Sequence, residues 1–222
     1  MALDFKGRMA YGDYLKLDRL LSAQVPLSDK QDEKLFIIVH HVQELWLSLI
    51  IHELEFAMQN MRDGKAGLAF KALARISRIQ EQLISAWDVL STLTPSDYLT
   101  FRDTLGQASG FQSYQYRLVE ILLGAKDERM LAPHRHTPQV YARLEAAFRG
   151  PSIYDEAIAL VQRSGLDVPD SLLNRDFSKT HSYSDALHDI WLQVYREPER
   201  YFELYELAEE LVDVEDHFQQ WR

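Results

Sequence analysis

The stretch that decides the fold is Ser28–Arg62, SDKQDEKLFIIVHHVQELWLSLIIHELEFAMQNMR, which contains neither glycine nor proline. Its apolar residues recur three and four positions apart, as at Leu35, Ile38, Val42 and Leu45. This spacing keeps them on one side of a helix with 3.6 residues per turn. The stretch therefore predicts a single amphipathic helix of many turns.

The rest of the chain repeats this helical pattern. The pair Asp63-Gly64 ends the first long helix, and a second long helix is expected over 65–92. Shorter helices are expected over 95–105, 111–123, 137–148, 153–163, 184–195 and 199–222. Strand-like alternation and internal repeats are not apparent. We therefore predict an all-α, long-helix bundle in one domain over 1–222, with a small helical insertion at about 125–174.

Composition excludes several function classes. The 222 residues carry a net charge of −10 and no cluster of basic side chains, which argues against nucleic acid and anionic membrane surfaces as partners. The chain has no cysteine, which excludes disulfides and thiolate ligands and fits a cytoplasmic protein. No signal peptide is expected over 1–12, and no uninterrupted apolar run reaches the length of about 18 residues that a membrane span needs.

Three pairs of side chains are candidates for chemistry because their spacing puts each pair on one helix face. They are Phe36 with His40, Tyr98 with Arg102, and Tyr11 with Tyr14. Each pair also has an ordinary structural interpretation. The phenylalanine and histidine fit a core residue beside a hydrogen-bonded histidine, the arginine fits a surface ion pair, and the tyrosines fit a packing edge or a subunit contact. Spacing alone does not separate these interpretations.

Motifs for other chemistries are missing or incomplete. Glu-x-x-His, which di-iron bundles need on two helices, does not occur in the chain. His134-Arg135-His136 has no neighbouring carboxylate, and neither a glycine-rich phosphate loop nor a Gly-x-Ser-x-Gly elbow is present. We therefore expect no dedicated non-haem metal site.

Several ordered segments together are specific. They are Tyr11-Gly12-Asp13-Tyr14-Leu15-Lys16-Leu17, Phe36-Ile37-Ile38-Val39-His40, Glu44-Leu45-Trp46, Phe101-Arg102, Ser109-Gly110-Phe111-Gln112-Ser113 with Gln115-Tyr116-Arg117, and Phe218-Gln219-Gln220-Trp221-Arg222. In this order the chain resembles the tryptophan 2,3-dioxygenase family over nearly its whole length. The segment that begins at Ser109 is the most specific of them.

The resemblance implies a function and a pocket. Members of this family open the indole ring of L-tryptophan with O₂ on haem b and release N-formyl-L-kynurenine. By resemblance, His40 is the catalytic distal histidine that meets the indole N–H, and Phe36 lines the indole pocket. Arg102, assisted by Tyr98, holds the substrate carboxylate. These residue types suit the chemistry, because a guanidinium takes a carboxylate through two parallel hydrogen bonds and a neutral imidazole accepts an N–H bond.

The resemblance also implies partners. The residues expected to reach a neighbouring subunit's pocket are Tyr11, Tyr14 and Leu15, so that subunits intertwine in a homotetramer, a dimer of dimers. The residues expected to contact haem are Trp87, Ser109 and Gly110. The proximal histidine that binds the iron is expected just beyond Arg222, so no residue of this chain is expected to bind the metal.

The sequence also departs from the family pattern in ways that leave alternatives open. A chain that lacks the proximal histidine is expected to bind haem poorly and turn over little. His217 is the histidine nearest to Arg222, and we interpret it as a surface or packing residue; His41, where the family more often has glutamine, receives no role. Two other functions remain possible at this stage: a related haem enzyme acting on another indole or aromatic substrate, and a haem-free helical module that binds tryptophan.

Overall fold

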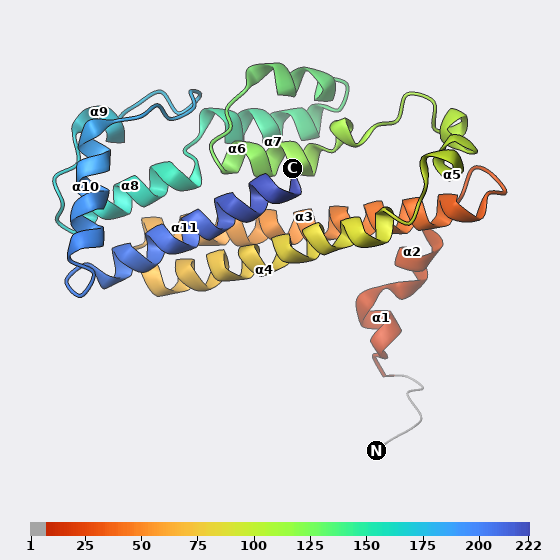
Figure 1. Ribbon diagram of the computed structural model, residues 1–222, viewed down its shortest axis with the longest axis horizontal. Helices are drawn as coiled ribbons and strands as arrows, with labels where there is room; N and C mark the ends of the chain where they lie inside the picture. The colour runs from red at the N-terminus through yellow and green to blue at the C-terminus, as the bar shows by residue number, and fades with distance from the viewer. Residues whose placement is uncertain (1–7) are drawn as a thin grey trace. The chain divides into compact units, whose positions relative to one another are not determined.

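The computed structural model describes residues 8–222, and it is built from helices (Figure 1). The α-helices are α1 (Tyr11–Leu15), α2 (Leu17–Ser22), α3 (Gln31–Arg62), α4 (Ala66–Leu90), α5 (Pro95–Leu99), α6 (Tyr114–Leu122), α7 (Pro138–Arg149), α8 (Ile153–Arg163), α9 (Asp170–Leu173), α10 (Asp185–Arg196) and α11 (Phe202–Trp221). The 3₁₀ helices are η1 (Arg102–Leu105), η2 (Gly110–Gln112) and η3 (Glu128–His134). No strand occurs between residues 8 and 222, so the prediction of an all-α fold is confirmed.

Internal contacts divide the chain into two compact units. The first unit contains the chain up to Val42 together with Trp87–Ala108, and the second contains Gln43–Ala86 and Ser109–Arg222. The long helices α3 and α4 each contribute to both units. The single domain over 1–222 and the insertion at about 125–174 stay predictions.

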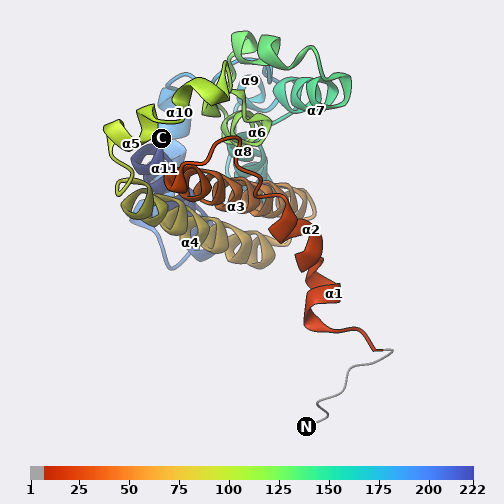
Figure 2. The same ribbon diagram turned by 90° about the vertical axis from the view of Figure 1, so that its right-hand side faces the viewer.

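The core of the second unit lies between three helices that run side by side (Figures 1 and 2). They are the C-terminal helix α11 and the parts of α3 and α4 that belong to this unit. The buried side chains of α3 follow the predicted three-and-four spacing, with Leu47, Ile50, Leu54 and Met61 at most 2 % exposed. Burial of apolar side chains of this size stabilises a fold by roughly 1.5–3 kcal/mol each. In this part of α3 the helical periodicity is the periodicity of core burial, whereas Ile38, Val42 and Leu45, nearer its start, are 41 %, 38 % and 53 % exposed.

A buried ionic cluster around Asp155 stabilises the second unit. The Asp155 carboxylate, near the start of α8, accepts hydrogen bonds from the Ser152 backbone N–H and hydroxyl, each at 2.7 Å. It also accepts from Arg175 Nε at 2.7 Å and from His181 Nε2 at 2.9 Å. Since Arg175 and His181 belong to the connection between α8 and α10, this carboxylate ties that long connection to the helix.

Two expected helices are interrupted where the sequence pattern suggested one. The helix expected over 95–105 is α5 followed by η1, because Phe101 between them leaves helical geometry with φ −127° and ψ −4°. The helix expected over 111–123 is η2 followed by α6. Ser113 lies between these two in extended backbone, and its hydroxyl accepts from the Tyr116 N–H as the N-cap of α6. Local capping at Ser113 therefore interrupted the otherwise helical apolar pattern over 111–123.

One helix, α3, is long and apolar enough to cross a membrane by length and composition alone. An 18-residue window of α3 has a mean hydropathy of 1.4, and 22 % of that window is buried. Core helices of soluble proteins have the same length and composition.

Candidate functional site

The start of α3 is held by a buried carboxylate in the first unit. Glu33 is 1 % exposed, and it accepts hydrogen bonds from the backbone N–H groups of Leu27 and Ser28 at 2.7 Å each. The Ser28 hydroxyl donates a third bond at 2.5 Å. This hydroxyl, together with the Leu27 N–H, holds the pKa of Glu33 below its ordinary value, so the group stays ionised. The carboxylate thereby fixes how the chain enters α3.

One turn further along α3, Phe36 and His40 form the centre of the candidate site. Their ring centroids are 4.1 Å apart, as their spacing of four predicted. His40 Nδ1 lies 2.7 Å from the Phe36 carbonyl oxygen. Because a carbonyl only accepts, Nδ1 carries the proton, and in the neutral ring Nε2 keeps its lone pair. His40 is therefore set up to accept a hydrogen bond at Nε2.

Two aromatic residues from the segment after α4 complete this cluster. The Tyr98 ring centroid lies 5.7 Å from that of Phe36, and the Phe101 centroid lies 5.8 Å from it. Tyr98 and Phe101 meet each other edge to face at 5.5 Å. These distances are within the range of favourable aromatic pairs. Phe36, His40, Tyr98 and Phe101, here called the aromatic cluster, thus form an apolar surface that suits a flat aromatic ligand.

Phe101 is the member of the cluster that the sequence analysis did not single out. Its side chain is 1 % exposed and is one of the largest fully buried side chains in the protein. The sequence signal was that Phe101 follows Tyr98 by three residues. Because the helix is interrupted after α5, this spacing did not identify Phe101 as part of the cluster. Phe101 is the buried anchor against which the rings of Phe36 and Tyr98 pack.

Arg102 follows this anchor directly and begins η1, so it does not lie on one regular helix face with Tyr98 as the spacing had suggested. Its Nη1 donates to the Gly106 carbonyl oxygen at 2.8 Å, and its side chain is partly buried. A guanidinium has five N–H donors, and this bond uses one of them. Gly106 has φ +56°, a conformation that favours glycine and brings its carbonyl back to Arg102. The other four N–H donors make no hydrogen bond to residues 8–222.

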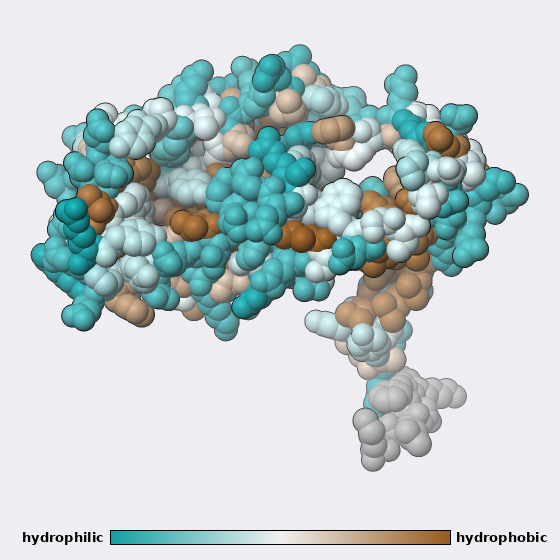
Figure 3. Space-filling model, viewed as in Figure 1, coloured by the Kyte–Doolittle hydropathy of each residue, from teal (hydrophilic) through white to brown (hydrophobic). Residues whose placement is uncertain are grey.

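The predicted subunit-contact residues lie on the exposed arm that carries α1 and α2. Tyr11 is 76 % exposed, Tyr14 is 70 % exposed and Leu15 is 39 % exposed. Figure 3 shows apolar residues, drawn in brown, gathering on this arm. An arm with so much exposed apolar surface is unusual unless another chain covers it.

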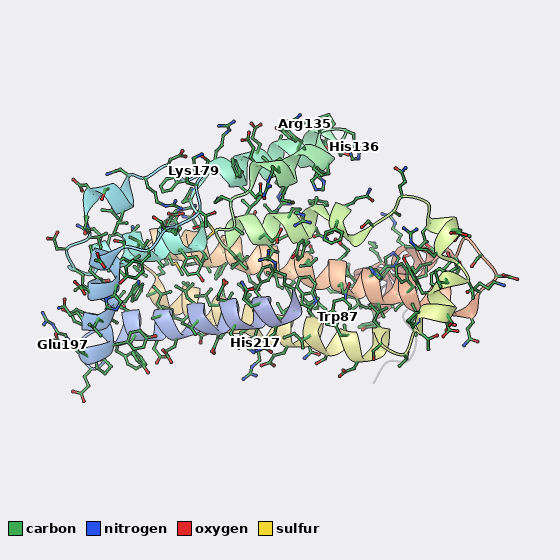
Figure 4. The ribbon with its side chains drawn as sticks, turned by 45° about the horizontal axis from the view of Figure 1, so that its top comes forward. Trp87, Arg135, His136, Lys179, Glu197 and His217 are labelled. Atoms are coloured by element: carbon green, nitrogen blue, oxygen red, sulfur yellow. The ribbon has the colours of Figure 1, made fainter. Side chains whose placement is uncertain are left out.

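The residues predicted to contact haem are exposed. Trp87, labelled on α4 in Figure 4, is 46 % exposed in the first unit. Ser109 caps η2 in the second unit, where its hydroxyl accepts from the Phe111 N–H at 3.3 Å. Gly110 has open space where a Cβ would lie. Their role stays a prediction.

A hydrogen bond in the second unit joins α6 to the turn of α3 that follows His40. Gln115 Nε2 donates to the Glu44 carbonyl oxygen at 2.9 Å and to the Glu44 carboxylate at 2.6 Å. Glu44 is four residues after His40 and therefore lies one turn along the same face. Both residues belong to motifs quoted for the resemblance, which assigned neither a role; their hydrogen bonds hold this part of α3 to α6.

The histidine nearest to the end of α11 is bonded within the core helices. His217 Nδ1 lies 2.8 Å from the Ser77 hydroxyl of α4, in agreement with its interpretation as a packing residue. Groups of three or more potential metal-ligating side chains do not occur in the part of the chain that the structure describes.

Comparisons of the sequence with known proteins point to one family. A sequence model of a family described as tryptophan 2,3-dioxygenase matches residues 2–192. The chain is 54 % identical over 220 residues to the tryptophan 2,3-dioxygenase of Bradyrhizobium sp. (strain BTAi1), covering 99 % of this chain and 79 % of the relative. It is 52 % identical over 220 residues to that of Polaromonas sp. (strain JS666), covering 99 % and 75 %, respectively. It is 50 % identical over 219 residues to that of Bacillus cereus (strain ZK / E33L), covering 99 % and 78 %, respectively. This chain belongs to the tryptophan 2,3-dioxygenase family.

Proposed function

We propose that the chain binds L-tryptophan against the aromatic cluster and takes part in the insertion of both atoms of O₂ into it, giving N-formyl-L-kynurenine. The bond that breaks is the C2–C3 bond of the indole ring, and both oxygen atoms end in the product, so no other reductant is needed. Family membership supports the reaction class. The observation that carries the proposal is the 2.7 Å bond from His40 Nδ1 to the Phe36 carbonyl oxygen, because it leaves Nε2 as an acceptor on a ring that packs against Phe36 of the aromatic cluster.

Each end of the substrate has a matching group. The indole N–H donates to His40 Nε2, and the indole face packs on the ring of Phe36, which the buried Phe101 supports from behind. The substrate carboxylate is bound by the free N–H donors of Arg102, with the Tyr98 hydroxyl as a further donor. A pocket with a fixed acceptor and a fixed cation rejects ligands that lack the N–H or the carboxylate, because its own polar groups would stay unpaired.

The proposed cofactor is haem b. On α3, Ile38 and Val42 lie four residues apart on one face and are 41 % and 38 % exposed, and Trp87 is 46 % exposed. Exposed apolar side chains of this kind fit the flat apolar face of a porphyrin. Trp87, Ser109 and Gly110 are the proposed haem contacts, and the family pattern assigns the axial ligand to no position of this chain. Ferrous haem, when bound, supplies the O₂ chemistry.

The test of the proposed function combines a spectrum with a product. Ferrous haem added to the protein in its full encoded length is expected to give a Soret band. L-tryptophan is then expected to disappear with one O₂ taken up per N-formyl-L-kynurenine formed, as measured by an oxygen electrode and chromatography. A protein that gives no Soret band, or that gives the band but no kynurenine, would contradict the proposal.

Replacing His40 with alanine is expected to reduce recognition of the indole N–H. In the parent protein, 1-methyl-L-tryptophan is expected to bind about tenfold more weakly than L-tryptophan, since one hydrogen bond of about 1.4 kcal/mol is lost. In His40→Ala this ratio is expected to approach one. The matched control is His41→Ala, because His41 Nδ1 lies beside Gln24 at 3.4 Å and receives no role in the pocket. An unchanged ratio in His40→Ala would count against this role.

We also propose that the protein is a cytoplasmic homotetramer in which Tyr11, Tyr14 and Leu15 of one chain complete a neighbour's pocket. The exposed apolar arm supports this proposal. Light scattering on the full-length protein is expected to give four times the mass of one chain, and Tyr14→Asp is expected to lower that mass. A monomeric parent protein would overturn the proposal.

A further inference from the structure

A cavity in the second unit is lined by none of the residues discussed above for tryptophan. Its volume is about 480 Å³, and it lies between α8, α10 and α11. Tyr154 of α8 and Trp191 and Tyr195 of α10 form its aromatic walls. The side chain of Glu215, from α11, reaches the same cavity. This volume is within the range of cavities that hold small organic ligands.

The aromatic walls are held in place, yet one of them keeps a free donor. The Tyr195 hydroxyl donates to the Glu209 carboxylate at 2.5 Å, and the Tyr154 hydroxyl lies 3.4 Å from Glu215 Oε2. Burial raises the pKa of Tyr154, and the Glu215 charge adds to that effect, so this hydroxyl stays neutral. Trp191 is partly buried, and hydrogen bonds among residues 8–222 do not use its indole N–H.

The charge in this cavity is negative and has no counter-charge. Glu215 accepts hydrogen bonds from two neutral groups, Tyr154 and the Gln219 amide, which donates at 2.8 Å. Within the described residues, no lysine, arginine or histidine nitrogen lies within ion-pair distance of Glu215. Asp216, its neighbour along α11, also lines the cavity, and its hydrogen bond comes from the neutral amide of Gln220 at 2.7 Å. The cavity thus presents carboxylates among aromatic rings.

We propose that this cavity binds a small organic cation, an aryl-alkylammonium, with its ammonium group on the Glu215 carboxylate and its ring against Trp191 and Tyr195. An ammonium is attracted both to a carboxylate and to the faces of tryptophan and tyrosine rings. The aryl group fits the apolar part of the wall, which includes Leu211 and Val212. The net charge of −10 on the whole chain adds attraction at long range.

The same chemistry separates this cavity from the proposed tryptophan pocket. L-tryptophan carries a carboxylate, which Glu215 and Asp216 repel, whereas the proposed tryptophan pocket supplies Arg102 for that group. The proposed ligand is therefore an amine without a carboxylate. This inference does not depend on the proposed function, since none of its residues belongs to the aromatic cluster.

The test uses 2-phenylethylamine with the full-length protein, because this amine has no indole N–H for His40 and no carboxylate for Arg102. Isothermal titration calorimetry is expected to show saturable binding at one site per chain. The neutral isostere 2-phenylethanol and the anion 3-phenylpropionate are expected to bind at least tenfold more weakly. If either of them binds as well as the amine, or if the amine does not saturate, the proposal is overturned.

The decisive variant is Glu215→Gln, which keeps the size of the side chain but removes the charge. Its carbonyl oxygen can still accept from the Gln219 amide, and its NH2 group can donate to the Tyr154 hydroxyl oxygen. The Kd of 2-phenylethylamine is expected to rise at least tenfold. The matched control is Glu209→Gln on the same helix, whose carboxylate bonds the Tyr195 hydroxyl without lining the cavity. An unchanged Kd in Glu215→Gln, or an equal rise in Glu209→Gln, would overturn the assignment. Both variants are expected to keep parent tryptophan turnover, which separates this test from that of the proposed function.

Discussion

Replacing Arg102 with leucine is expected to raise the apparent KM for L-tryptophan about 100-fold. The guanidinium is proposed to hold the substrate carboxylate through two charge-assisted hydrogen bonds, each of about 1.5 kcal/mol. The sum, about 3 kcal/mol, corresponds to roughly a hundredfold in binding. Steady-state kinetics over a wide range of tryptophan concentration measures this effect. The change should appear mainly in KM, because the carboxylate takes no part in the bonds that break.

Two controls separate the loss of the clamp from a local folding defect. Arg102 also bonds the Gly106 carbonyl oxygen, so Arg102→Leu removes one bond within the 102–106 turn. Arg102→Lys keeps a positive charge but loses the planar fork, and we expect an intermediate rise in KM. Binding of tryptamine, which has no carboxylate, should change little in either variant. Near-normal saturation by L-tryptophan in a folded Arg102→Leu protein would refute the clamp.

Replacing Asp155 with asparagine is expected to cost about 3 kcal/mol of unfolding free energy, because it leaves a buried guanidinium without its counter-charge. The Asp155 side chain is 3 % exposed and that of Arg175 is 13 % exposed, so solvent screens the pair weakly. The asparagine also places an amide N–H group against the hydrogen-bond donors of Ser152 or Arg175, and two donors cannot form a hydrogen bond with each other. Thermal unfolding is expected to start roughly 6–12 °C lower in a chain of this length.

This cluster also sets how stability changes with pH. Burial raises the pKa of Asp155, but the bonds from His181, Arg175 and Ser152 outweigh it and hold the pKa far below the ordinary value of aspartate. A carboxyl group whose pKa is lower in the folded state stabilises the fold at neutral pH. That contribution is lost as the pH falls below about 4, where the unfolded chain takes up the proton first. The parent protein is therefore expected to lose stability in acid more steeply than Asp155→Asn.

The matched control for this prediction is Asp176→Asn, in the same connection. Asp176 is exposed and accepts from the Ser178 N–H at 3.0 Å, so its loss is expected to change the unfolding free energy by less than about 0.5 kcal/mol. Lys126 provides a second readout. Burial lowers the pKa of Lys126 to about 8, and the Asp155 charge opposes that shift, so Asp155→Asn is expected to lower this pKa further. Equal stability of the two asparagine variants would contradict the proposed role of the cluster.

The sequence predicted the helices and the centre of the candidate site well. α3 and α4 lie within three residues of their expected ends, and Phe36 and His40 are side by side as their spacing required. Both results depend on contacts between residues at most four positions apart. The spacing of residues in the sequence shows such contacts directly. The interruption after α5 was missed, because Phe101 leaves the helix to fill a position in the core that its neighbours in sequence do not reveal.

The sequence by itself determined the all-α fold, the family and the identity of the residues expected to meet tryptophan. Tertiary structure alone decided that Phe101 anchors the aromatic cluster, that Asp155 gathers donors from 20 and 26 residues away, and that Glu215 faces aromatic walls without a cation. The physical reason is the range of the interactions. Helix periodicity arises between residues three and four apart, whereas burial and ion pairing join side chains whose meeting depends on how whole helices pack.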